Sequence, residues 1–286
     1  MMRNPKSDFF KKRPKAGKAK KQEPETSQKP EQPEKTKDKI LTHIEEEVRL
    51  NKYLARAGVC SRREADQLIA KGKVIVNGQV ITEMGYKVLT TDQVECDGKK
   101  LNPEKLQYVL LNKPKDFITT TSDEHDRRTV MDLISKACDE KINPVGRLDR
   151  QTTGLLLFTN DGNLANKLTH PSGGIRKIYE VTLDRELEEE DLTKLKEGLS
   201  LEDGKAYVDE ASILEENKVG LEIHIGKNRI VRRMFEHLKY DVIKLDRTVF
   251  AGLTKKDLPR GKYRHLKPNE INNLKMLTGQ KKNKNT

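Results

Sequence analysis

An arginine and an aspartate, two residues apart, stand directly before an unbroken apolar run near the middle of the chain. Residues 146–158 are GRLDRQTTGLLLF, so Arg147 and Asp149 lie in the turn that leads into a strand predicted over 154–159. A carboxylate in such a turn can act as a nucleophile or as a general base. Most turn aspartates instead accept hydrogen bonds from their own backbone, and spacing alone leaves that alternative open.

Few other groups in the sequence suggest chemistry by themselves. Tyr179 lies in KIYEVTL, an alternating strand in which most tyrosines simply pack. Cys60, Cys96 and Cys138 are far apart and have no histidine beside them, so we expect reduced, buried thiols and no metal site. Neither a dinucleotide-binding nor a P-loop glycine pattern occurs, so the sequence gives no support for a nucleotide cofactor.

Length and charge limit the class of protein. The 286 residues suffice for two domains and a tail, and 57 Lys+Arg against 45 Asp+Glu give a net charge of +12. Such a charge favours a polyanionic partner such as nucleic acid. No apolar run approaches the length of a membrane span and no secretory signal begins the chain, so we expect a cytoplasmic protein.

The composition divides the chain into four parts. Residues 1–46 are rich in Lys, Pro, Glu and Gln, and we expect a disordered basic tail there. We expect a small domain over 47–106, a larger domain over 107–275 and a second basic tail over 276–286.

Two short helices and two hairpins are predicted in the small domain. Ser61 and Glu64 fit a capping box, and Asn77-Gly78 and Asp97-Gly98 are strong hairpin turns. Together with the stretch KVIVNG at 73–78, this order resembles the S4 RNA-binding domain. The resemblance implies an RNA-binding helix pair with basic side chains around it: Arg56, Arg62, Arg63, Lys71 and Lys73.

The larger domain is predicted to be α+β. Apolar strand-like runs occur near 108–121, 154–159, 177–183, 211–214 and 219–225, and helical stripes lie at 163–169, 188–198 and 229–238. Because strands and helices do not alternate regularly, we expect a mostly antiparallel sheet with flanking helices and no Rossmann-type sheet.

Four segments of this domain, taken in order, resemble the motifs of pseudouridine synthases, in the branch represented by RsuA and RluB. These are NKPKDFITTTS at 112–122, the GRLD stretch around Asp149, KIY at 177–179 and GKNRIVRRM at 226–234. Two departures stand out: Asp116-Phe117 replaces a usual glycine, and Ile230 stands where Gln or Glu is commoner. We therefore give Ile230 no polar role.

The resemblance implies a role for each matched residue. Asp149 is the implied catalytic residue, Tyr179 stacks on a flipped uracil and Arg232 pairs with Asp149, since a guanidinium favours the charged form of a carboxylate. Lys113 and Lys177 are expected to contact substrate or RNA. Arg147 is expected either to do the same or to serve only the fold. The reaction rearranges one nucleotide without gain or loss of atoms, so no cofactor is expected.

Two functions follow from these observations. The first is isomerisation of a uridine in ribosomal RNA, with that of the large subunit preferred, by a monomer that meets free RNA or ribosome-assembly intermediates. The second is a non-catalytic RNA-binding or ribosome-assembly factor of the S4 type. The net charge of the chain agrees with both functions, but only the first explains why GRLD, KIY and RRM occur together.

Overall fold

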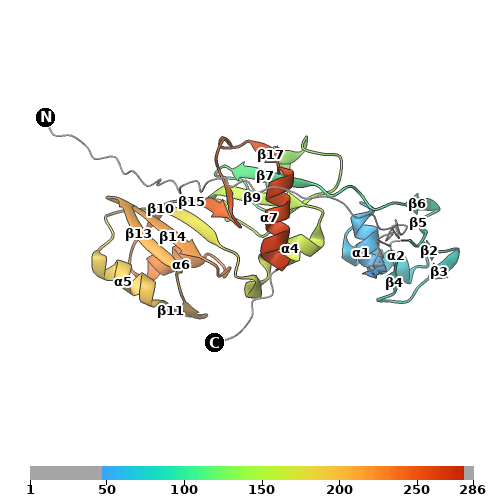
Figure 1. Ribbon diagram of the computed structural model, residues 1–286, viewed down its shortest axis with the longest axis horizontal. Helices are drawn as coiled ribbons and strands as arrows, with labels where there is room; N and C mark the ends of the chain where they lie inside the picture. Colours follow the sequence, from blue (N-terminus) through green and yellow to red (C-terminus); the bar gives the residue numbers. More distant parts are fainter. Residues whose placement is uncertain (1–46, 90, 280–286) are drawn as a thin grey trace, which may run out of the picture. The chain divides into compact units, whose positions relative to one another are not determined.

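The computed structural model describes residues 47–89 and 91–279 (Figure 1). The tail predicted at 1–46 lies outside these residues. Within them, no helix is long and apolar enough to cross a membrane.

The N-terminal segment of the described chain is built from two helices and six short strands. Helices α1 and α2 pack against each other, and the strands form a two-stranded sheet, β1-β4, and an antiparallel sheet of order β3-β2-β5-β6. The bounds are β1 Val48–Arg49, α1 Leu50–Arg56, α2 Arg62–Ala70, β2 Val74–Val76, β3 Gln79–Ile81, β4 Lys87–Val88, β5 Val94–Cys96 and β6 Lys99–Leu101.

Local sequence signals account for this segment. The Ser61 side chain accepts from the backbone N–H of Glu64, whose carboxylate in turn accepts from the Ser61 N–H, so the capping box is confirmed. Asn77 and Gly78 both have positive φ, as a tight hairpin turn between β2 and β3 requires. The buried residues Leu50, Leu54 and Ile69 join the helix pair to the sheet.

The larger domain is organised on a nine-stranded sheet of order β13-β14-β10-β15-β9-β7-β17, with β16 beside β15 and β8 beside β9. All pairs are antiparallel except β15 with β9, which confirms the predicted mostly antiparallel α+β fold. The bounds are β7 Tyr108–Lys113, β8 Asn143–Pro144, β9 Thr153–Thr159, β10 Lys177–Leu183, β13 Glu210–Glu215, β14 Lys218–Ile223, β15 Val242–Phe250, β16 Leu253–Thr254 and β17 Tyr263–His265.

Helices cover both faces of the middle of this sheet. On one face Leu156 and Phe158 of β9 join a core with α3, α5 and α6. On the other, Leu155 and Leu157 join a core with α4 and α7, which lie side by side (Figure 1). The unbroken apolar run of β9 is therefore explained, because a strand buried on both faces needs no polar alternation. The bounds are α3 Val130–Ile134, α4 Gly162–Thr169, α5 Glu189–Glu197, α6 Ile230–His237 and α7 Pro268–Gly279.

Several features differ from the sequence-based expectations, among them helix α3 and strand β15, which form where we predicted no element. Residues 117–121 form no strand and make only one isolated bridge, between Ile118 and Thr129. Helix α7 continues past residue 275 to Gly279, so the tail predicted from 276 begins inside a helix. A small hairpin, β11 (Leu199–Leu201) and β12 (Gly204–Ala206), follows α5, where we predicted no strands.

Candidate active site

Asp149 lies in the turn just before β9, and this turn is held from beneath by Lys113. The Lys113 ammonium is fully buried and donates to the backbone oxygens of Pro114 (3.1 Å), Asp149 (3.1 Å), Arg150 (3.2 Å) and Thr152 (2.8 Å). The Thr152 N–H donates to the Asp149 oxygen across the turn at 3.0 Å. We call residues 149–152 the catalytic loop, after the role that the family resemblance implies for Asp149, and its backbone is fixed mainly by one lysine.

The segment after β7 fixes the other side of this loop. The Thr119 hydroxyl donates to the Leu148 oxygen at 2.8 Å and accepts from the Leu148 N–H at 3.2 Å. The Asp116 N–H donates to the Arg150 oxygen at 2.9 Å. Asp116 has a φ of +68°, in the left-handed region, which explains why glycine is usual at this position and why aspartate is tolerated.

Gly154 brings the start of β9 against β15. Its φ is +107°, and a Cβ at this position would lie 2.3 Å from the backbone oxygen of Arg247. This close approach coincides with the parallel pairing of Thr153 and Gly154 with Asp246 and Arg247. No residue with a Cβ fits at position 154 without a shift of the backbone. Gly154 therefore allows β9 to approach β15 closely, and this fixes where the catalytic loop joins the sheet.

A small cleft of about 80 Å³ opens beside the catalytic loop. It is lined by Arg147, Leu148, Asp149, Thr152, Tyr179, Lys227, Arg229, Ile230, Val231 and Leu245. Asp149 is partly exposed and Tyr179, on β10, is 8% exposed, so both border the same hollow. The structure therefore brings together three residues predicted from the sequence: Asp149, Tyr179 and Arg147.

Two cations of the cleft were not predicted. Lys227 and Arg229 precede α6 within the GKNRIVRRM stretch, where we expected only Arg232 to matter. Arg229 adopts a left-handed φ of +46° and its guanidinium bonds Glu236 at 3.0 Å. The Lys227 ammonium donates to the Asp203 backbone oxygen of the β11–β12 hairpin at 2.7 Å. The backbone conformation of Arg229 and the cleft itself are visible only in the structure; the one sign in the sequence was that both cations lie in the matched GKNRIVRRM stretch.

Arg232 does not form the direct ion pair with Asp149 that the family pattern implies. Within the described chain its Nη1 donates to the Val242 oxygen at 2.9 Å, and its buried Nε has no partner. Burial and the charge of Arg229 lower the pKa of Arg232, while the Asp149 carboxylate acts in the opposite direction. Arg232 thus lies within the electrostatic reach of Asp149, but α6 directs its guanidinium toward β15.

Lys113 and Lys177 are placed differently from the expectation that they contact RNA. The Lys177 ammonium donates to the backbone oxygens of His224 (2.9 Å) and Ile225 (3.3 Å), which ties β10 to the segment after β14. Burial lowers the pKa of each lysine to about 8. Neither lysine lines the cleft, and contact with RNA stays a prediction for both. Lys113 is fully buried and Lys177 partly so, because a lysine beside unpaired backbone carbonyls donates to them.

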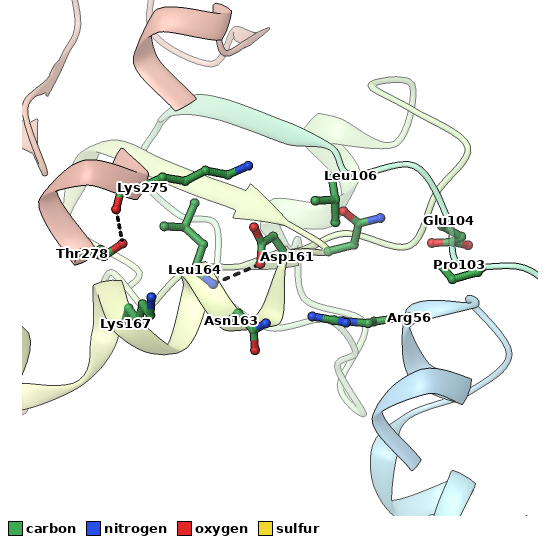
Figure 2. Close-up of a pocket in the computed structure, with 11 residues that line it drawn as sticks. Arg56, Pro103, Glu104, Leu106, Asp161, Asn163, Leu164, Lys167, Lys275 and Thr278 are labelled. Atoms are coloured by element: carbon green, nitrogen blue, oxygen red, sulfur yellow. Dashed lines mark hydrogen bonds between the residues drawn. The ribbon is translucent and has the colours of Figure 1, made fainter. Parts of the chain in front are cut away.

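The basic residues predicted on the first domain are mostly accessible. Arg62, Arg63 and Lys73 are exposed, and Lys73 forms an ion pair with Asp97 at 3.1 Å. Arg56 is partly buried and lines a hollow of about 420 Å³ that shares no residue with the Asp149 cleft (Figure 2). In that hollow Asp161 caps α4 by accepting from the Leu164 N–H and also accepts from the Tyr108 hydroxyl, so its carboxylate serves the fold.

The cysteines take no part in the cleft. Cys96 is buried and Cys60 and Cys138 are partly so, and burial raises the pKa of all three thiols, which keeps them protonated. Within the described ranges, no group of three or more His, Cys, Asp or Glu side chains is arranged to hold a metal ion.

The larger domain is a mostly antiparallel α+β fold whose cleft holds a carboxylate and an aromatic ring beside several cations, and it follows a small domain with exposed basic residues. A family model described as RNA pseudouridylate synthase matches residues 107–237, and the S4 domain model matches residues 48–94. The chain belongs to the RNA pseudouridine synthase family.

Individual relatives agree with this assignment. Ribosomal large subunit pseudouridine synthase B of Bacillus subtilis is 44% identical over 82% of this chain and 98% of that protein. The dual-specificity RNA pseudouridine synthase RluF of Escherichia coli is 34% identical over 79% and 78%, respectively. A crystal structure of a pseudouridylate synthase is 30% identical, with a TM-score of 0.58 over 79% of this chain and 99% of that one.

Proposed function

We propose that this enzyme converts a uridine of ribosomal RNA to pseudouridine, with Asp149 as the catalytic residue. The observation that carries the proposal is that Asp149 and Tyr179, from separate elements, line one small cleft with the cations Arg147, Lys227 and Arg229 around it. Such a cleft suits a single nucleotide taken out of its stack, with a flat ring for the base and positive charge for the phosphates.

The carboxylate supplies the chemistry. The reaction breaks the N1–C1′ bond of uridine and joins C5 to C1′; C5 loses a proton and N1 gains one, so no atom is gained or lost overall. Asp149 serves this isomerisation either by attacking the nucleotide or by removing a proton from its ribose, and both routes need its ionised form.

The neighbouring residues hold the nucleotide. Tyr179 presents its ring to the extruded uracil, and stacking offsets part of the few kcal/mol lost on unstacking. Arg147, Lys227 and Arg229 contact the flanking phosphates. Arg232 lies close enough to interact with the charge of Asp149 but forms no direct ion pair with it, because its guanidinium is bonded to the Val242 oxygen.

Asp149→Asn tests the assignment. The amide keeps the size of the side chain but cannot ionise, so we expect normal folding and RNA binding with no pseudouridine formed. Asp139→Asn makes the same change at an exposed site outside the cleft and serves as the matched control. Product from Asp149→Asn at the wild-type rate would overturn the catalytic role. The absence of product even from wild-type protein with complete ribosomal RNA would favour a non-catalytic S4-type factor.

The substrate is proposed to be large-subunit ribosomal RNA. This choice is supported by the relative from Bacillus subtilis, whose name states that subunit and which this chain covers almost completely. Mapping pseudouridines in the host's ribosomal RNA with and without the gene should show the loss of a site in the large-subunit RNA. Loss of a site only in the small-subunit RNA would contradict it.

We further propose that the enzyme acts in the cytoplasm as a monomer, on RNA that is free or held in ribosome-assembly intermediates. Light scattering of the purified chain should give a mass near 32.8 kDa. Sedimentation of cell extracts should place the enzyme with immature subunits, and a stable dimer or exclusive association with mature ribosomes would contradict these proposals.

A further inference from the structure

A buried carboxylate lies on β15 behind the catalytic loop. The Asp246 side chain is 13% exposed and accepts from the Thr153 hydroxyl at 2.7 Å, from Arg260 Nη1 at 2.8 Å and from the Lys255 ammonium. Burial acts to raise the pKa of Asp246, but hydrogen bonds from Arg260, Lys255 and Thr153 outweigh it and hold that pKa at about 2. The carboxylate is therefore ionised at every pH at which the protein is used.

Two of these partners, Arg260 and Thr153, connect Asp246 to the catalytic loop. Arg260 Nη1 also donates to the backbone oxygen of Lys113 at 3.2 Å, and Lys113 is the residue whose ammonium bonds the loop carbonyls. Thr153 is the residue that follows the loop, and its hydroxyl lies near the Leu245 oxygen as well as the Asp246 carboxylate. Asp246 thus connects the residue beneath the loop with the residue at its end.

The segment that carries Arg260 is itself fixed to β7. Asn112, next to Lys113, donates from its side chain to the Leu258 oxygen at 2.8 Å, and its backbone oxygen accepts from the Gly261 N–H at 2.8 Å. Asn112 is buried, so these bonds are shielded from water. The Arg260 guanidinium is therefore presented to Lys113 from a segment with little freedom to move.

We propose that Asp246 and Arg260 are positioning residues for the reaction: by fixing Lys113 and Thr153 they set the direction of the Asp149 carboxylate. The proposal rests on the catalytic role given to Asp149 above. Misplacing a catalytic group by about 1 Å can lower a rate on the order of a hundredfold, so a remote ion pair can affect catalysis without touching the substrate.

Lys255 provides a matched control within the same cluster. It bonds the other oxygen of the Asp246 carboxylate, and no hydrogen bond from Lys255 to Lys113, Thr153 or the catalytic loop is found among the described residues. Both Lys255 and Arg260 are partly exposed, at 29% and 42% of the side chain, so either can be replaced without opening the core. A purely structural role for the cluster would make the two replacements equivalent.

The test compares Arg260→Met, Arg260→Lys and Lys255→Met on ribosomal RNA transcripts by steady-state kinetics, which give KM, and by single-turnover kinetics, which give the maximal rate, with melting temperatures measured in parallel. For Arg260→Met we expect a maximal rate about tenfold lower, with KM within twofold of wild type. Arg260→Lys should recover most of that rate, and Lys255→Met should stay within twofold whatever its melting temperature.

Equal rate losses in Arg260→Met and Lys255→Met, or a higher KM at an unchanged maximal rate in Arg260→Met, would overturn the positioning role. These outcomes are separate from failure of the proposed function, which is decided by Asp149→Asn. If Asp149→Asn abolishes product while Arg260→Met and wild type react equally fast, Asp149 keeps its role and the positioning proposal is wrong.

Discussion

The Lys113 ammonium lies 3.1 Å from the backbone oxygen of Asp149, inside the protein and not on its surface. The same nitrogen bonds three further carbonyls, although an ammonium has only three N–H groups, so the donors are shared. The position of the candidate catalytic residue thus depends on one buried cation that has no contact with solvent.

Replacing Lys113 by Met should loosen this arrangement. The apolar side chain fills similar space but leaves buried carbonyls without a donor, and we expect the free energy of unfolding to fall by about 2 to 3 kcal/mol. Pseudouridine formation should fall further than stability explains, because the loop loses its fixed backbone. Urea denaturation and a product assay at a temperature where the variant is folded measure the two effects. Full activity in the folded variant would contradict the role of Lys113.

The pKa of Lys113 predicts a pH dependence. Burial is the main cause that lowers this pKa to about 8. The charge of Arg260 acts in the same direction, whereas the charges of Asp149 and Asp116 act to raise it. Between pH 8 and the ordinary lysine pKa of 10.5, the folded protein binds fewer protons than the unfolded chain, so this group makes the unfolding free energy rise with pH. The gain should be on the order of 1 to 2 kcal/mol by pH 9.5.

Activity should follow the opposite course in that window. A neutral amine has two N–H donors in place of three, so above pH 8 Lys113 makes fewer hydrogen bonds to the carbonyls of the catalytic loop. Lys177 has a similar pKa and adds to the slope of the stability curve, so the comparison with Lys113→Met isolates the contribution of Lys113. Identical stability slopes in wild type and Lys113→Met from pH 7.5 to 9.5 would show that Lys113 does not titrate there.

Gly154→Ala should be strongly destabilising. The new methyl would lie 2.3 Å from the Arg247 backbone oxygen, and alanine disfavours a φ of +107°. We expect a loss of about 3 kcal/mol or more in the free energy of unfolding. Gly162→Ala is the control, because its Cβ meets nothing within 4 Å and the residue opens α4. If the two variants have the same melting temperature, the close approach of β9 to β15 is not required for stability.

Tyr179 should act through its ring and not its hydroxyl. No hydrogen bond of the hydroxyl is found in the described part of the chain, and the ring borders the cleft. Tyr179→Phe keeps the surface on which a base can stack, so its rate should stay within about twofold of wild type. Tyr179→Leu should lose about 10- to 100-fold, the equivalent of one stacking interaction. Equal rates for the two variants would argue against stacking.

The helix pair of the S4 domain should contribute affinity and no chemistry. Replacing both Arg62 and Arg63 by Ala should weaken RNA binding and lower the salt dependence, by roughly one unit of slope for each phosphate that is no longer neutralised. The rate at saturating RNA should be unchanged. Replacing Lys99 and Lys100 on β6 removes the same charge from another element of this domain and should have a smaller effect. A larger effect at Lys99 and Lys100 would place the RNA on a different surface.

Local signals in the sequence predicted much of the fold. The capping box at Ser61, the turn at Asn77-Gly78 and the alternating strand around Tyr179 all lie where expected, because each depends on residues close together in the chain. Helices α3 and α7, strand β15 and the β11–β12 hairpin were missed. Helix α7 carries one fully buried residue, Leu274, so it offers almost no apolar periodicity to detect.

The types and order of residues in the chain, with the family that they resemble, determined the class of fold, the RNA-binding character and the choice of Asp149 and Tyr179 as site residues, and left two roles open for Arg147. Only the tertiary structure decided which cations, Arg147 among them, reach the cleft. Lys113 and Lys177 turn inward, Arg232 turns toward Val242, and Lys227 and Arg229 take their place. The physical reason is that a long cationic side chain binds carbonyl and carboxylate oxygens that have no other donor. Such partners can be far apart in the sequence: Arg260 donates to the backbone oxygen of Lys113, 147 residues away.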